Sequence, residues 1–338
     1  MTMRPEDLLT PTPKGLYCPP GDFYIDPTRA VPFAVVTHGH ADHARAGHGA
    51  VLATPATLDI MAARYGQEFT AARQPSPYGT RVLHKGVAVT LYPAGHVLGS
   101  AQVLVEHGGL RMVVSGDYKR RRDPTCVLFE PVACDVFITE ATFGLPVFRH
   151  PPAGEEIAKL IASRDLFHDK AHLVGAYSLG KAQRVIAMLR EAGHDAPIYV
   201  HGALERINRV YEHHGVALGA LRPLSEAKKE GLAGAIVIAP PSALNDRWSR
   251  RLGHAVRAYA SGWMRIRARA RQIGVELPLV ISDHADWDEL TETLSELAPA
   301  QIWVTHGNED ALVHWAALQG RRARPLSLTG YGDDEDAA

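Results

Sequence analysis

The sequence predicts an α/β fold in which a second domain is inserted into a larger one. Through most of the 338 residues, runs of β-branched and apolar residues alternate with stretches of helical period. A dense group of metal-ligand residue types follows one of these runs near the N-terminus, and charge is divided unevenly along the chain. Together these observations favour a layered α/β domain with a metal site and a basic insertion.

The first part of the chain is expected to consist mainly of closely spaced strands. Phe33–Val36 has the composition of a buried strand. Val87–Leu91, Ala101–Val105 and Arg111–Val114 are separated by turn-forming glycine and proline residues, which predicts a meander. Asp135–Thr139 is expected to form a further strand.

After Gly144 the pattern changes to that of a second domain. Helices are expected at Glu155–Arg164 and Leu179–Ala192, with short strands at Leu173–Ala176 and Ile198–Val200. Strand-like runs return closer to the C-terminus, and each is followed by a histidine: Pro278–Ser282 and Ile302–Thr305. The expected domains are 1–144 and 278–331 for the first domain, 145–277 for the insertion and 332–338 for an acidic, disordered tail.

Composition argues against a membrane protein and against a thiolate metal site. No apolar run reaches the ~18 residues that span a bilayer, and the N-terminus lacks the basic-then-apolar pattern of a secretory signal. The three cysteines form no CxxC pair. We therefore expect a soluble, cytoplasmic protein whose cysteines are structural.

The overall net charge of −1 hides a strong asymmetry. Residues 145–277 contain 20 lysines and arginines against 12 acidic residues, whereas the rest of the chain has 16 basic and 25 acidic residues. A basic insertion beside an acidic domain suggests that the acidic domain carries the catalytic site and that the basic part covers it and binds a polyanion. The alternative is that arginine replaces lysine on solvated helices.

Residues 38–43 hold three imidazoles and a carboxylate directly after the first apolar run. In an extended turn His38 and His40 point to one side, while Asp42 and His43 can face another, so one loop can serve two cations. Many enzymes that hydrolyse phosphoesters use two cations ~3.5–4 Å apart. Zinc readily takes imidazole and carboxylate ligands. The alternative, a histidine-rich surface loop, does not account for the spacing or for the strand that precedes it.

Two further ligand candidates follow along the chain. His96 lies between Gly95 and Gly99, where the backbone can bend close to a bound ion. Asp117 ends a strand-like run as Ser-Gly-Asp, and a carboxylate at the end of a strand can bridge two cations. A Gly-Asp pair alone is usually a turn, so the weight of Asp117 comes from its order after the other candidates.

That order, HxHxDH, a glycine-flanked histidine and then SGD, resembles the metallo-β-lactamase superfamily. Three later motifs resemble those of its nucleic-acid-processing β-CASP branch: Glu140 in TEATF as motif A, His284 in SDHAD as motif B and His306 in THG as motif C. The resemblance implies an αβ/βα sandwich with a β-CASP cap domain inserted between motifs A and B. The basic residues 145–277 occupy the place of that cap.

Within the branch, the chain is most similar to the bacterial ligase-associated DNA exonucleases. Gly15–Pro19, Phe23–Asp26 and Tyr177–Gln183 carry this likeness. The sister groups are RNA-processing nucleases and the eukaryotic crosslink-repair nucleases. Many crosslink-repair members have valine at motif C, so His306 argues against that group.

The resemblance also implies a metal-ligand set. His38, His40 and His96 would hold one cation, and Asp42, His43 and His306 the other, with Asp117 bridging them. Five imidazoles and two carboxylates suit zinc, with manganese as the alternative. Asp26 resembles the first motif of the family and is expected to orient a ligand histidine rather than to bind metal itself.

The implied chemistry is hydrolysis by a metal-activated water. His284, oriented by Glu140, would protonate the departing sugar oxygen as a general acid, and Asp117 would complete the catalytic group. The alternative for His284 is a structural histidine at the end of a strand. In the insertion, Ser178 and Lys181 at the start of a helix are candidates for phosphate binding, although a serine N-cap explains the pattern almost as well.

Arginine-rich stretches of the insertion are candidates for a strand-binding groove, with solvated helices as the alternative: Arg247, Arg250, Arg251, Arg265, Arg267, Arg269 and Arg271. Three aromatic residues there could stack on bases, although such residues are more often core: Tyr177, Tyr259 and Trp263.

The resemblance predicts a two-metal DNA exonuclease of DNA repair. Its expected substrate is DNA with single-stranded or frayed ends, and its expected functional association is with a DNA ligase and a helicase. The alternatives are an RNA-processing β-CASP ribonuclease, which would act on RNA, and a non-catalytic nucleic-acid-binding subunit. A small-molecule hydrolase would not need so large a basic cap.

Overall fold

The computed structural model describes residues 3–227, 232–326 and 328. The chain divides into two compact units: the first runs up to Arg149 and resumes at His284, and the inserted unit comprises His150–Asp283. These divisions lie a few residues after the boundaries expected at 144 and 277. The expected acidic tail, 332–338, lies outside the described residues.

The smaller sheet of the first unit has six strands in chain order. They are β1 (Thr10–Thr12), β2 (Gly15–Cys18), β3 (Phe23–Ile25), β4 (Phe33–Val35), β5 (His48–Ala53) and β6 (Thr70–Pro75). The first three strands pair antiparallel, and β3 to β6 pair parallel. The apolar run predicted as a buried strand is β4, at the centre of the parallel part.

The larger sheet of the first unit has the order β19-β18-β11-β10-β9-β8-β7. Its strands are β7 (Arg81–His84), β8 (Val87–Pro93), β9 (Ala101–His107), β10 (Leu110–Val114), β11 (Val136–Ala141), β18 (Gln301–Gly307) and β19 (Ala323–Pro325). The predicted meander is confirmed, because β8, β9 and β10 pair antiparallel in succession. The strands β10, β11, β18 and β19 are parallel.

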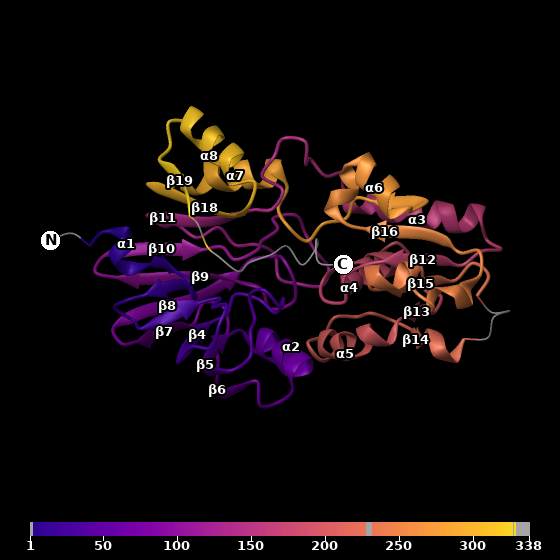
Figure 1. The fold of residues 1–338 in the computed structure, drawn as a ribbon, viewed down its shortest axis with the longest axis horizontal. Coiled ribbons are helices and arrows are strands. Elements are labelled where there is room, and N and C mark those ends of the chain that lie inside the picture. The colour runs from indigo at the N-terminus through magenta and orange to yellow at the C-terminus, as the bar shows by residue number, and fades with distance from the viewer. Residues whose placement is uncertain (1–2, 228–231, 327, 329–338) are drawn as a thin grey trace. The chain divides into compact units, whose positions relative to one another are not determined.

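Alternating side chains divide the first unit into four layers. On β9, Val103 and Val105 belong to the core between the two sheets, which also receives Leu8 from α1 (Pro5–Leu8). Leu104 faces the other way, into the core beneath α7 (Trp287–Leu297) and α8 (Glu309–Leu318). The smaller sheet is covered on its outer face by α2 (Pro55–Tyr65), as Figure 1 shows. The expected αβ/βα sandwich is therefore confirmed.

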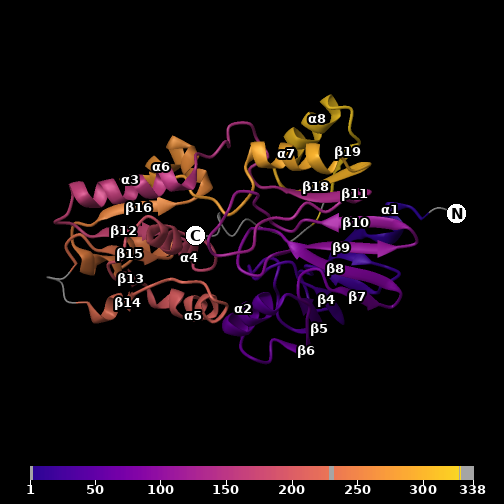
Figure 2. The same cartoon turned by 180° about the vertical axis from the view of Figure 1, so that it is seen from behind.

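The inserted unit is built on a six-stranded parallel sheet with the order β14-β13-β15-β12-β16-β17. The strands are β12 (His172–Gly175), β13 (Ile198–Val200), β14 (Leu221–Pro223), β15 (Ile236–Ala239), β16 (Val256–Ala260) and β17 (Leu277–Leu279). Every residue of β12 and β15 is buried, as expected for a parallel sheet covered on both faces. Its helices, seen from both sides in Figures 1 and 2, are α3 (Ala153–Leu166), α4 (Lys181–Glu191), α5 (Glu205–His213) and α6 (Arg267–Ile273).

Two local predictions need adjustment. The helix expected from Leu179 begins at Lys181, because Gly180 is its N-cap and has a positive φ of 88°. The strand expected at Pro278–Ser282 ends at Leu279, so His284 does not follow a strand directly. Arg267, Arg269 and Arg271 lie on α6, in agreement with the helix that was given as the alternative for these arginines. In the described part of the chain, helices are too short or too polar to cross a membrane.

Candidate metal centre

The loop after β4 is held in place by Asp26. One carboxylate oxygen of Asp26 accepts a hydrogen bond from the Thr37 amide at 2.8 Å, and the other accepts from the Thr37 hydroxyl at 2.6 Å. The second oxygen also lies 2.8 Å from Nδ1 of His43. Asp26 thereby fixes both ends of the loop and leaves Nε2 of His43 as the nitrogen that faces the neighbouring carboxylates.

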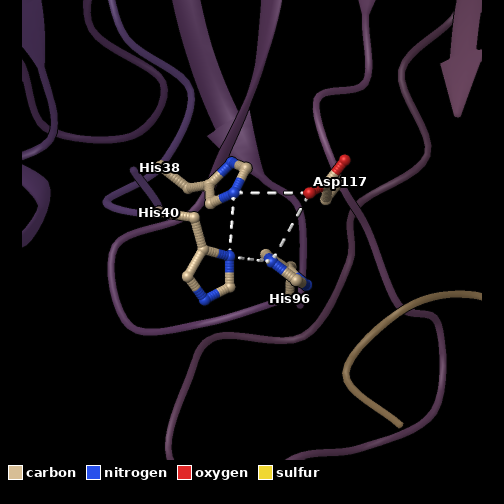
Figure 3. Close-up of side chains that lie close together, drawn as sticks. All are labelled: His38, His40, His96 and Asp117. Atoms are coloured by element: carbon tan, nitrogen blue, oxygen red, sulfur yellow. Dashed lines mark hydrogen bonds and ion pairs between the residues drawn. The ribbon is translucent and has the colours of Figure 1, made fainter. Parts of the chain in front are cut away.

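Four buried or nearly buried side chains converge beside this loop: His38, His40, His96 and Asp117 (Figure 3). Nδ1 of His40 lies 3.1 Å from Nε2 of His38 and 3.0 Å from Nε2 of His96. Oδ2 of Asp117 lies 3.4 Å from Nε2 of His38 and 3.8 Å from Nε2 of His96. Three imidazole nitrogens and one carboxylate oxygen therefore face a single point.

These separations match the edges of a metal-coordination tetrahedron. Zinc binds imidazole nitrogen at about 2.0–2.1 Å, and a tetrahedron of that radius has edges of about 3.3 Å. The four measured distances lie on either side of this value. These four separations are close to those of a zinc-sized site, and all four donor atoms lie within 4.8 Å of one another.

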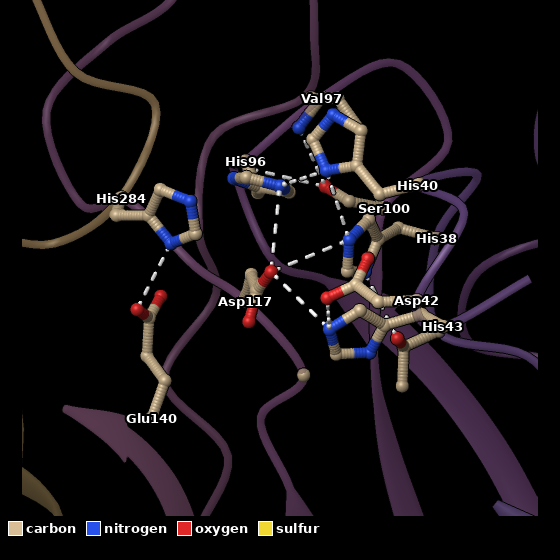
Figure 4. A network of polar contacts seen from close by, with 12 residues as sticks. His38, His40, Asp42, His43, His96, Val97, Ser100, Asp117, Glu140 and His284 are labelled. Carbon is tan, nitrogen blue, oxygen red and sulfur yellow. Dashed lines mark hydrogen bonds and ion pairs between the residues drawn. The ribbon is translucent and has the colours of Figure 1, made fainter. Parts of the chain in front are cut away.

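A second group of donors shares Asp117 with the first (Figure 4). Nε2 of His43 lies 3.4 Å from the same Oδ2 of Asp117 and also 3.4 Å from Oδ2 of Asp42. The ring of His306 lies beside that of His43, with 5.3 Å between the centroids. Oδ1 of Asp42 is buried and has no hydrogen-bond partner within the described residues, which is the condition of an oxygen suited to a cation. Asp42 and His43 thus have donor atoms beside Asp117, whereas His306 is placed only by its ring contact with His43. A second metal-ligand set of Asp42, His43 and His306 stays a prediction.

The backbone at His306 is adapted to this position. His306 has a positive φ of 57°, and the pairing of β11 with β18 shifts register between Glu140 and Ala141, so that Gly307 rather than His306 faces Ala141. Such a bulge redirects one side chain out of the strand alternation. Strained backbone of this kind is concentrated at functional sites.

The candidate donors differ in protonation. Burial opposes the charged form of His43, but Asp42, Asp117 and Asp26 outweigh it and raise the pKa of His43 well above its usual value. Burial dominates at three other donors. It lowers the pKa of His38 well below its usual value and lowers the pKa of His306 to about 3, so both imidazoles are neutral at pH 7 as metal binding requires. Burial raises the pKa of Asp117 to about 8, against the attraction of nearby histidines. A carboxylate in that environment is costly as an anion unless a cation compensates it.

Glu140 and His284 form a hydrogen-bonded pair in the same unit. Nδ1 of His284 lies 3.0 Å from Oε2 of Glu140, and Oε1 of Glu140 accepts the Tyr118 amide at 2.7 Å. Because Glu140 accepts from Nδ1, Nε2 is the ring nitrogen of His284 that does not face Glu140. The His284 ring lies 4.6 Å from that of His96, centroid to centroid. The two motifs are therefore brought to the edge of the metal-ligand cluster.

The phosphate-site candidates lie in the inserted unit in a different setting. Lys181 is 1% exposed, its ammonium lies 3.3 Å from Oδ1 of Asp283, and it faces the ring of Tyr177 at 4.8 Å. The carbonyl of Ser178 accepts a hydrogen bond from Gln183. The ammonium of Lys181 is thus paired with the carboxylate of Asp283. Phosphate binding by Ser178 and Lys181 stays a prediction.

The candidate stacking residues in the inserted unit have partners within it. The hydroxyls of Tyr259 and Tyr177 lie 3.5 Å apart, and the guanidinium of Arg269 lies 3.9 Å above the ring of Trp263. Tyr259 belongs to the core of the unit. Base stacking by these residues also stays a prediction.

A buried ionic network that the sequence did not predict lies next to this centre. Glu289 accepts hydrogen bonds from Lys119 and from the amides of Arg120 and Arg121. Asp286 caps α7 and forms a capping box with Glu289, so the pattern Asp-x-x-Glu was a usable signal for the helix start. Nothing in the sequence marked Lys119 except its place two residues after Asp117.

No family model matches the chain. A protein of Opitutus terrae named "Probable DNA ligase" is 30% identical over 328 residues, which are 95% of this chain and 31% of that protein. The Dictyostelium discoideum "Cleavage and polyadenylation specificity factor subunit 3" is 24% identical over 70% of this chain and 37% of its own length. The Neurospora crassa "Endoribonuclease ysh-1" is 33% identical over 34% of this chain and 14% of its own.

The names of these relatives, the order of the motifs and the sandwich fold all indicate the same family. The chain belongs to the β-CASP branch of the metallo-β-lactamase superfamily. This β-CASP chain spans about a third of the length of the first two relatives. A solved structure of an Enterococcus faecalis protein of unknown function shares the fold, with a TM-score of 0.56, 11% identity, and coverage of 88% of this chain and 80% of that one. Membership of the β-CASP branch implies divalent metal ions, which the histidine and aspartate cluster is suited to bind.

Proposed function

We propose that this β-CASP chain is a two-metal phosphodiesterase that degrades DNA from an end. The observation that carries the proposal is the shared oxygen of Asp117, which faces His38 and His96 on one side and His43 on the other. A carboxylate placed between two donor groups is suited to hold two cations close together, as phosphoester hydrolysis requires. Five imidazoles in the set favour zinc, and manganese is the alternative.

Different residues of the chain are proposed to bind the cations and to transfer the proton. Two bound cations would supply a nucleophilic water and Lewis acidity for the charge that develops on phosphate. As the water oxygen bonds to phosphorus, the bond from phosphorus to the sugar oxygen breaks, and Nε2 of His284 donates its proton to that oxygen. Glu140 keeps the opposite nitrogen protonated and stabilises the imidazolium before transfer. The expected products carry a 5′-phosphate and a 3′-hydroxyl.

DNA is the favoured substrate because of the extent of the likeness to the Opitutus protein. The alignment covers 95% of this chain, whereas the alignments to the two RNA-related relatives cover 70% and 34% of it. Ends with a 5′-phosphate and a 3′-hydroxyl are also those that a DNA ligase joins. We therefore propose action at single-stranded or frayed DNA ends in repair, in functional association with a ligase and a helicase.

The inserted unit is proposed to hold the nucleic acid. Residues 145–277 have an excess of eight positive charges, a composition suited to a polyanion. The named relatives that process or cleave RNA favour a second candidate, a β-CASP ribonuclease. Sequence-independent phosphate contacts do not by themselves separate DNA from RNA, because that choice depends on recognition of the 2′-hydroxyl.

Digestion of matched DNA and RNA oligonucleotides, labelled at either end, tests the proposal. Metal-free protein is supplied with zinc or manganese, and Asp117→Ala serves as the inactive variant. A DNA ladder that shortens from one end supports the exonuclease and gives its polarity and metal. Faster, internal cleavage of RNA would replace it with the ribonuclease, and no cleavage of either strand by wild type would refute both.

A further inference from the structure

The segment that carries His284 lies outside the regular structure of the first unit. Residues 284–286 precede α7 and belong to no helix or strand. The backbone there is held instead by two residues that directly follow Asp117: the carbonyl of Tyr118 accepts the Ala285 amide at 2.6 Å, and the ammonium of Lys119 donates to the His284 carbonyl at 3.0 Å. The position of His284 thus depends on these contacts.

Lys119 is itself fixed from the opposite side. It is 3% exposed, and its ammonium also donates to Oε2 of Glu289 at 3.0 Å. Oε1 of Glu289 accepts the amides of Arg120 and Arg121 at 2.9 and 2.8 Å, so the carboxylate cannot rotate without losing several hydrogen bonds. The amine is therefore held at a defined point against the His284 carbonyl.

The same short stretch of chain contacts both parts of the centre. Asp117 offers its oxygen to the metal-ligand cluster, Tyr118 donates its amide to Glu140, and Lys119 holds the backbone of His284. A shift of this stretch would move the shared carboxylate and the proton donor together. A buried ion pair alone is weak evidence for stability, because desolvation of both charges offsets their attraction.

We infer that Lys119 is a positioning residue for His284. Its ammonium links the His284 carbonyl to the Glu289 carboxylate, and this link places the imidazole beside the point where the leaving oxygen of the scissile phosphate will lie. This inference rests on the proposed function, in which His284 protonates that oxygen. Lys119 touches neither the substrate nor the metals in this account. It acts only through the placement of His284.

The test compares two substrates that differ in their need for a proton. A sugar oxygen leaves as a strongly basic alkoxide unless it is protonated, whereas nitrophenolate leaves without a proton. Loss of His284 should therefore slow cleavage of a DNA strand much more than cleavage of a nitrophenyl phosphodiester of thymidine. A residue that only supports the metals or the fold would slow both substrates equally.

Lys119→Met is expected to follow the pattern of His284→Ala. On DNA its kcat should fall on the order of 100-fold with little change in KM, since misplacement of a reacting group by about 1 Å has that effect. On the nitrophenyl diester the fall should stay below about 3-fold, and Lys119→Met should cost nothing further in a His284→Ala background.

Two further variants separate positioning from folding. Lys119→Met combined with Glu289→Gln removes both charges, so no unpaired charge stays buried, and should keep the selective loss on DNA. Lys85→Met is the matched control, because Lys85 pairs with Asp22 at an exposed turn at the opposite end of β8 from the His96 loop. It should leave both rates unchanged.

Equal losses of Lys119→Met on the two substrates, or an unchanged rate on DNA, would overturn the inference. The proposed function would still be supported by cleavage by wild type and by a loss in His284→Ala that is confined to DNA. Wild-type protein that cleaves neither substrate, with either metal, would overturn the proposed function and the inference with it. A selective loss in both Lys119 variants, absent in Lys85→Met, supports the positioning role.

Discussion

Glu289→Gln should destabilise the first unit by about 3 kcal/mol at neutral pH. Burial alone would raise the pKa of Glu289, but Lys119, Arg121 and backbone amides outweigh it and hold the pKa at about 2 instead of 4.5. One pKa unit corresponds to ~1.36 kcal/mol, so the ionised carboxylate contributes about 3 kcal/mol. Removal of one partner of a buried pair independently gives ~3–5 kcal/mol.

The pH dependence of this loss has a fixed sign. Because the pKa is lowered in the folded state, the stabilisation is complete above about 4.5 and is lost as pH falls towards 2. The difference in free energy of unfolding between wild type and Glu289→Gln should therefore be largest at pH 7 and shrink below pH 4.5. Glutamine also satisfies a capping box, so the substitution removes the charge and largely keeps the cap.

Urea unfolding at a series of pH values measures this difference, and hydrogen exchange of the α7 amides assigns it to the first unit. The control is Asp288→Asn, one residue away, whose carboxylate pairs with Arg149 with both side chains more than half exposed. That change should stay within about 0.5 kcal/mol. A loss below 1 kcal/mol for Glu289→Gln at pH 7, or one that does not vary between pH 7 and 3, would refute the reasoning.

Three further outcomes are expected. Asp26→Ala should lower metal affinity about 10–100-fold, because His43 loses the carboxylate that orients it. Competition with a chromogenic chelator measures this affinity, and an unchanged value would show that the loop keeps its conformation without Asp26. Gly95→Ala should reduce both activity and thermal stability, since its Cβ would overlap the Lys119 carbonyl at a φ of 74°; a Tm and a cleavage rate equal to those of wild type would contradict this. Removal of divalent ions with EDTA should lower the Tm, and restored zinc should raise it again; an unchanged Tm would argue against binding by the folded state.

The sequence analysis succeeded where local pattern and residue chemistry agree. Apolar runs separated by turn-forming glycine and proline residues predicted the meander of β8 to β10, and the sandwich fold follows from the family resemblance. His38 and His40 lie far from His96 and Asp117 in the sequence, yet the fold brings the four side chains together. Their metal-binding roles remain predictions.

The missed features depend on tertiary contact. Lys119 and Glu289 are separated by 170 positions, so their pairing has no local periodicity or spacing to reveal it. Phosphate binding by Lys181 stays a prediction, but its contact with Asp283, about a hundred residues further along, has no signal in the sequence. Burial of a charged side chain is set by distant partners, and a sequence pattern alone does not indicate it.

The central claim is that Asp117 lies between two cations. Metal analysis of zinc-loaded protein, combined with anomalous diffraction at the zinc edge, measures it directly. The account predicts two zinc ions per chain, about 3.5–4 Å apart, with Asp117 contacting both, and a clear loss of bound zinc in Asp117→Ala. A single ion, or two ions that do not share Asp117, would contradict it.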